Sequence, residues 1–137
     1  MNRLKLLLAS SIVAVLPGCA LYDAYMMAGY DTNEYALAVK VKTIAEVGVE
    51  YCDKTTTSFL NFKDMYEKSV ELRNFAKNTP DNPEASKLAQ NLVDLSKTGL
   101  DLYKKQTEVS PAFCKLKMGQ IEKNADKISH VLARKPR

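Results

Sequence analysis

Apolar residues recur every three or four positions along most of the chain after residue 30, and this spacing constrains the fold more than any other feature. Residues three and four apart lie on one face of an α-helix. The sequence holds four such segments, and none shows the alternation that is typical of a strand. The predicted buried faces are Leu37, Val41, Ile44, Gly48 and Tyr51; Phe59, Phe62, Met65, Tyr66, Ser69, Leu72 and Ala76; Ala85, Leu88, Leu92, Leu95, Gly99 and Leu102; and Cys114, Met118, Ile121, Ala125, Ile128 and Leu132.

The first two helices have polar residues at their expected starts. Asp31 followed three positions later by Glu34 is a capping-box pattern, and this helix is expected to end near residues 53–54. Residues 55–58, Thr-Thr-Thr-Ser, offer several N-caps for the second helix, which is expected to stop around Lys77 before a run rich in Asn and Pro.

The third and fourth helices share one start signal. Asn82 and Ser110 are good caps, and each is followed by a proline, Pro83 or Pro111, at the first helical position. The last residues, 133–137, are expected to fray.

Four long helices joined by short connections predict an all-α fold, an antiparallel up-down-up-down four-helix bundle over residues 31–137. Small residues in the stripes (Gly48, Ser69, Gly99 and Ala125) permit close helix approach. Splayed helical hairpins and a coiled-coil assembly between chains are the alternatives.

The bundle topology predicts a disulfide between Cys52 and Cys114. Cys52 ends the first helix and Cys114 begins the fourth, so both lie at the same pole on adjacent helices. A bridge needs α-carbons within about 7 Å. Two free buried thiols or an interchain bridge remain the alternatives.

The first eighteen residues have the layout of a secretory signal peptide. Arg3 and Lys5 precede an uncharged stretch, residues 6–16, which is too short to span a membrane. The following residues, Leu16-Pro17-Gly18-Cys19, resemble the lipobox of bacterial lipoproteins, with Pro17 where that class usually has Ala or Ser.

The resemblance implies cleavage after Gly18 and lipidation of Cys19. The absence of Asp at position 20 resembles outer-membrane lipoproteins, so we expect the chain to be anchored in the outer membrane, facing the periplasm. Residues 19–30 are then the lipidated cysteine and a tether, whose Tyr and Met residues either meet the membrane interface or fold back onto the bundle.

Residues with catalytic or metal-binding chemistry are sparse. The chain has one histidine, His130, and no phosphate-binding loop, nucleophile elbow or paired metal-ligand motif. We therefore predict no catalytic residues, no bound metal and no cofactor.

Charge is unevenly distributed along the sequence. Residues 20–103 carry a net −4 and residues 104–137 a net +6, while the overall +4 is too small to argue for nucleic-acid binding. The basic end either meets an anionic partner or balances acidic neighbouring helices. The candidate basic surface is Lys115, Lys123, Lys127, Arg134 and Lys135.

Together these features predict a small, non-enzymatic envelope lipoprotein that binds a protein or an envelope polymer, in an accessory, inhibitory or exclusion role. The alternative is a periplasmic carrier of a small ligand or cofactor held inside the bundle. Its candidate contacts are Tyr51, Met65, Tyr66, Tyr103 and Met118.

Overall fold

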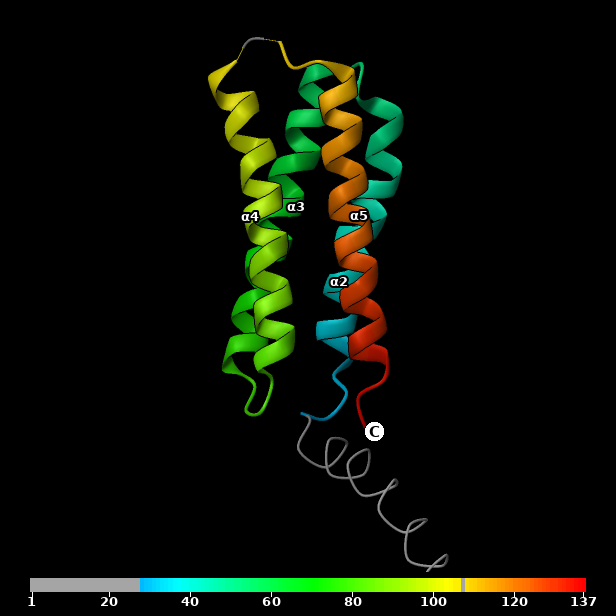
Figure 1. Ribbon diagram of the computed structural model, residues 1–137, viewed down its shortest axis with the longest axis vertical. Coiled ribbons are helices and arrows are strands. Elements are labelled where there is room, and N and C mark those ends of the chain that lie inside the picture. The colour runs from blue at the N-terminus through cyan, green and yellow to red at the C-terminus, as the bar shows by residue number, and fades with distance from the viewer. Residues whose placement is uncertain (1–27, 107) are drawn as a thin grey trace, which may run out of the picture.

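A computed structural model describes residues 28–106 and 108–137, which form an antiparallel up-down-up-down bundle of four helices (Figure 1). This confirms the predicted fold. The predicted signal peptide and Cys19 lie outside the described residues. A short 3₁₀ turn, η1, follows the first helix. The elements are α2 (Thr32–Gly48), η1 (Val49–Tyr51), α3 (Thr55–Asn78), α4 (Pro83–Lys105) and α5 (Pro111–Ala133).

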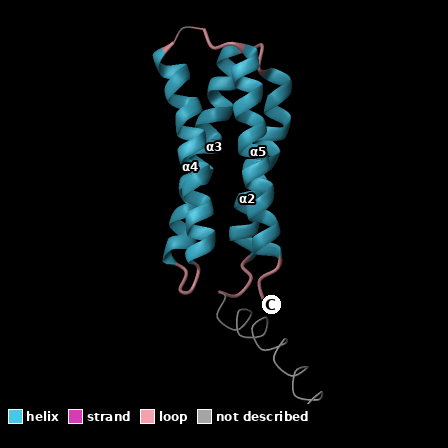
Figure 2. Cartoon of the chain, viewed as in Figure 1, coloured by secondary structure: helices cyan, strands magenta, loops and turns pink. Residues whose placement is uncertain are grey.

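The four helices lie at the corners of a square, and each packs mainly on its two neighbours around that square. α2 and α5 pack together although they are the first and last of the described helices, and α3 and α4 form a hairpin that makes the other pair (Figure 2). The described part of the chain contains no strand. One chain therefore buries its own apolar faces, as the short connections predicted.

The predicted caps are confirmed at two of the four helix starts. Asp31 accepts hydrogen bonds from the backbone nitrogens of Asn33 and Glu34, and Ser110 accepts one from the nitrogen of Phe113. Pro111 occupies the first turn of its helix, where its missing N–H costs nothing.

The start of α3 differs from the prediction. Its N-cap is Lys54, with no side-chain hydrogen bond, and residues 55–58 already belong to the first turn. Ser58 does not cap the helix, because its hydroxyl donates to the carbonyl oxygen of Tyr51 at 2.9 Å. α2 also ends earlier than predicted, at Gly48, and η1 carries the chain to Cys52.

The predicted buried face of α5 is confirmed at every position, because each of its six residues is at most 1% exposed. The face predicted for α4 is rotated. Leu88, Leu95 and Leu102 are only partly buried, and the centre of the interface is lined by smaller or flatter side chains. The buried residues of α4 include Ala85, Ala89, Leu92, Ser96, Gly99 and Tyr103.

Gly99 explains this rotation, because the Phe62 ring of α3 lies directly against its backbone. A β-carbon at position 99 would overlap two atoms of that ring and press against a third. Phe62 is fully buried and also packs on Tyr103, with ring centroids 5.4 Å apart. The two helices can approach this closely only because α4 places small residues at the interface.

We predict that Gly99→Ala lowers the free energy of unfolding by about 1–3 kcal/mol, the usual cost of overpacking a core. The matched control is Gly119→Ala on α5, where an added β-carbon meets no atom within 4 Å. The control should be neutral or stabilising by up to about 1 kcal/mol, since alanine favours helix. Urea denaturation measures both, and equal effects would contradict the close approach.

Candidate functional site

The two ends of the bundle are chemically different, and the first is closed by a disulfide. Cys52 and Cys114 are bonded, with their α-carbons 5.6 Å apart, which confirms the predicted pair. Both cysteines are buried, and the Ser58 hydroxyl lies 3.6 Å from the Cys114 sulfur. The bridge joins the end of η1 to the first turn of α5. We call the end of the bundle that holds this bridge the disulfide end.

Large exposed apolar side chains gather at the disulfide end. Val47 lies in the last turn of α2 and Tyr51 in η1, while Leu60 and Leu116 lie in the second turns of α3 and α5. Their exposed fractions run from 36% to 58%. Single exposed apolar residues are common on protein surfaces, but all four of the large apolar side chains that the described residues expose lie within two turns of this end.

An open groove of about 290 Å³ runs between α2 and α3 beside these residues. Val47, Gly48 and Tyr51 line its α2 side, and Asn61 and Asp64 line its α3 side. Leu60 is four residues before Asp64, so the two lie on the same side of α3. The disulfide end therefore combines apolar side chains with hydrogen-bonding groups.

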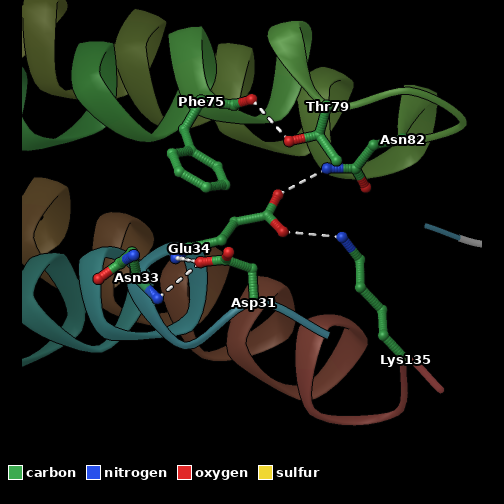
Figure 3. Close-up of polar contacts among 7 residues, drawn as sticks. All are labelled: Asp31, Asn33, Glu34, Phe75, Thr79, Asn82 and Lys135. Atoms are coloured by element: carbon green, nitrogen blue, oxygen red, sulfur yellow. Dashed lines mark hydrogen bonds and ion pairs between the residues drawn. The ribbon is translucent and has the colours of Figure 1, made fainter. Parts of the chain in front are cut away.

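A buried charge cluster closes the opposite end of the bundle (Figure 3). Glu34 is fully buried; one carboxylate oxygen accepts from the Lys135 ammonium group and the other from the Asn82 amide, both at 2.7 Å. Lys135 and Asn82 are themselves buried. The cluster joins the start of α2, the α3–α4 loop and the segment after α5, and we call it the Glu34 cluster.

This cluster corrects three predictions. Glu34 does not complete a capping box, because its carboxylate faces the core instead of the start of its own helix. Asn82 precedes Pro83 as expected, but its side chain bonds to Glu34 and makes no cap hydrogen bond. Lys135 is not part of a basic surface, because its side chain is only 2% exposed and pairs with a buried carboxylate.

The segments just before α2 and just after α5 make further contacts at this end of the bundle. The Tyr30 nitrogen donates to the Pro136 carbonyl oxygen at 2.8 Å, and the Arg137 guanidinium lies 5.4 Å from the centre of the Tyr30 ring. The expectation that residues 133–137 fray is therefore wrong. Residues 28–30 fold onto the bundle, with the Ala28 nitrogen donating to the Asp81 carbonyl oxygen at 3.2 Å.

The remaining predicted basic residues do not form one cluster with Lys135. Lys115, Lys123, Lys127 and Arg134 are exposed along α5 and just after it, over the whole length of the helix. On the same helix, the Asp126 carboxylate already forms an ion pair within the protein. The ammonium of Lys42 on α2 donates to Asp126 on α5 at 2.7 Å, which is the intramolecular balance of charge that the sequence left open.

This hydrogen bond is the main reason that the pKa of Asp126 lies below its ordinary value, and it raises the pKa of Lys42. The favourable effect of the ionised Asp126 is therefore present above the ordinary aspartate pKa and is lost as the pH falls through the lowered one. His130, one turn further along α5, is exposed and lies 3.5 Å from the other oxygen of Asp126.

We predict that removing the disulfide lowers the free energy of unfolding by about 4 kcal/mol, because the bridge closes a loop of 62 positions in the unfolded chain. The comparison is the oxidised protein against the Cys52→Ala/Cys114→Ala double variant, by urea denaturation. Adding a reductant to the unmutated protein should reproduce the loss and should leave the double variant unchanged. A double variant as stable as the parent would contradict the prediction.

We predict that Lys135→Met destabilises the protein by about 3–5 kcal/mol, because it leaves the Glu34 carboxylate buried without its cation. Adding Glu34→Leu should restore most of the loss, since the unpaired charge is then gone. Lys127→Met, on an exposed lysine, should change stability by less than about 0.5 kcal/mol. Thermal denaturation of the four proteins tests this, and equal effects at positions 127 and 135 would refute it.

Within residues 28–106 and 108–137, no three His, Cys, Asp or Glu side chains gather where they would hold a metal ion. None of the described helices combines the length and apolar character needed to cross a bilayer.

Comparison with protein families, with curated proteins and with solved structures found no match to this chain.

Proposed function

We propose that this protein is a small, non-enzymatic lipoprotein of the cell envelope, anchored through Cys19, that binds a protein or envelope polymer with its disulfide end. The anchor rests on the sequence Leu16-Pro17-Gly18-Cys19 and on the basic and apolar segments before it. A disulfide is in keeping with an oxidising compartment beyond the cytoplasm. The outer membrane, with the bundle facing the periplasm, is the proposed location.

One observation carries the binding proposal: the exposed apolar residues lie at the end of the bundle opposite the chain's entry. Ala28, nine residues after Cys19, is bonded to the α3–α4 loop (Figure 1). Each helix is about 25–35 Å long at 1.5 Å per residue, so the disulfide end stands that far from the anchored end. A partner can therefore reach Val47, Tyr51 and Leu60 without meeting the membrane.

A second candidate function is a carrier of a small ligand between the helices. Three buried hydroxyl groups, those of Ser69, Ser96 and Tyr103, have no hydrogen-bond partner among the described residues, and such groups are costly to leave unpaired. Met65 and Met118 are fully buried, while Tyr51 is exposed and unavailable to an interior ligand. Native mass spectrometry of protein purified from its own cells tests this candidate, since a carrier retains a species of defined mass.

The anchor is tested by the Cys19→Ser variant. We expect the unmutated protein to gain the mass of its acyl chains and to sediment with membranes, and we expect the variant to lose both properties because the lipidated thiol is gone. Mass spectrometry of the N-terminal peptide measures the first, and fractionation measures the second. An unmodified Cys19 in the mature protein would contradict the lipoprotein assignment.

The partner is sought by a photo-crosslinking residue placed at position 60 in intact cells, with position 127 on the exposed face of α5 near the other end as the matched control. We expect one discrete adduct from position 60 and none from position 127. Val47→Asp in the same chain should reduce the adduct about tenfold or more, since charging a residue central to an interface costs at least about 1–2 kcal/mol. Adducts from both positions alike, or turnover of a substrate by the purified protein, would count against the proposal.

A further inference from the structure

A second open groove, of about 640 Å³, lies at the end of the bundle that holds the Glu34 cluster. It runs between the last turns of α3 and the first turns of α4. Three cationic side chains line it: Arg73 and Lys77 from α3, and Lys87 from α4. None of the three forms an ion pair with a carboxylate among the described residues.

The Arg73 guanidinium has N–H groups left that can donate to an anion. Arg73 donates from Nη1 to Gln90 at 3.3 Å and from Nε and Nη2 to the Asn74 side chain at 3.2 and 2.9 Å. A guanidinium has five N–H groups, so one N–H on each Nη remains for a ligand. Glu84 is the carboxylate nearest along α4 to Lys87, three residues away, and it forms no ion pair with the groove cations; further along α4, Asp94 accepts a hydrogen bond from the Gln90 amide at 2.9 Å.

The net charge along the sequence does not predict this groove. Its cations belong to residues 20–103, the part of the chain with a net negative charge. Arg73 and Lys77 are one turn apart on α3, and the hairpin to α4 brings Lys87 beside them. Three cations therefore converge in space within an acidic stretch of sequence.

We propose that this groove binds the phosphate group of an anionic phospholipid in the membrane that holds the anchor, a step that rests on the proposed lipidation of Cys19. The Ala28 nitrogen is bonded to Asp81 in the α3–α4 loop, so the chain enters beside the groove. Nine residues reach at most about 30 Å, which keeps this end of the bundle close to the headgroups. Arginine and lysine are the side chains that bind phosphate best.

Binding at the groove fixes the orientation of the bundle on the membrane. A tether alone leaves the domain free to tilt, whereas a second contact beside the point of entry holds the α3–α4 edge toward the lipid. The disulfide end, with Val47, Tyr51 and Leu60, then points away from that surface.

The test measures how fast single lysines of the full lipidated protein react with an amine acetylating reagent, read by mass spectrometry. Vesicles of phosphatidylcholine are compared with vesicles containing about 30% phosphatidylglycerol. We expect Lys77 and Lys87 to react at least about fivefold more slowly on the anionic vesicles, the factor that one cation contributes at such a surface. Lys127, exposed on α5 two turns from the same end, is the reference within each molecule and should slow by less than twofold.

Two variants of equal charge separate the groove from the general attraction of an anionic surface. Arg73→Gln keeps both lysines and should abolish their protection. Arg134→Gln removes an exposed cation at the same end of the bundle but outside the groove, and it should leave the protection intact. Thermal denaturation shows that both variants fold.

Four results would overturn the proposal: no slowing of Lys77 and Lys87 on anionic vesicles, equal slowing of Lys127, equal loss of protection in both variants, or full protection by soluble glycerol phosphate over neutral vesicles. The last would assign the groove to a soluble phosphate ester in place of a lipid. Flotation with neutral vesicles tests the anchor separately. A chain that fails to float contradicts the lipoprotein assignment, whereas a chain that floats without lipid-dependent protection contradicts the groove alone.

Discussion

The buried pair between Glu34 and Lys135 is the interaction on which one end of this bundle depends. Removing two opposite charges from water is expensive, and their mutual attraction and hydrogen bonds have to offset that cost. Here the Asn82 amide takes the second carboxylate oxygen, so three segments far apart in sequence must all be in place together. Such a cluster is a demanding condition on the fold, because an alternative packing of the same helices would leave a charge unpaired in the core.

The sequence predicted the fold well where one physical effect decided the outcome. The face of α5 follows from simple hydrophobic periodicity, and the pairing of Cys52 with Cys114 follows from the direction of the helices once the bundle is assumed. It failed where tertiary packing overrode local preference. α4 turns Leu88, Leu95 and Leu102 to the flanks because the Phe62 ring needs the space over Gly99. Glu34 leaves its capping role because Lys135, 101 positions away, pairs with its carboxylate.

The same limit applies to the candidate sites. The excess of positive charge in residues 104–137 predicted a basic surface there. In the structure Lys135 from that region is buried, and Asp126 forms an ion pair with Lys42. The groove of Arg73, Lys77 and Lys87 depends on an inter-helix pairing that no count along the sequence reveals. The exposed apolar residues near the disulfide, such as Val47 and Leu60, are far apart in sequence. They lie at the same end of the bundle because successive helices run in opposite directions.

If the chain is anchored through Cys19 as proposed, the hydrogen bonds from Ala28 to Asp81 and from Tyr30 to Pro136 have a mechanical consequence. A pull on the chain ahead of residue 28 is shared between the loop after α3 and the segment after α5 before it can peel the first turn of α2. Glu34 and Lys135 belong to the segments that these bonds join, so part of the load would also fall on this buried ion pair.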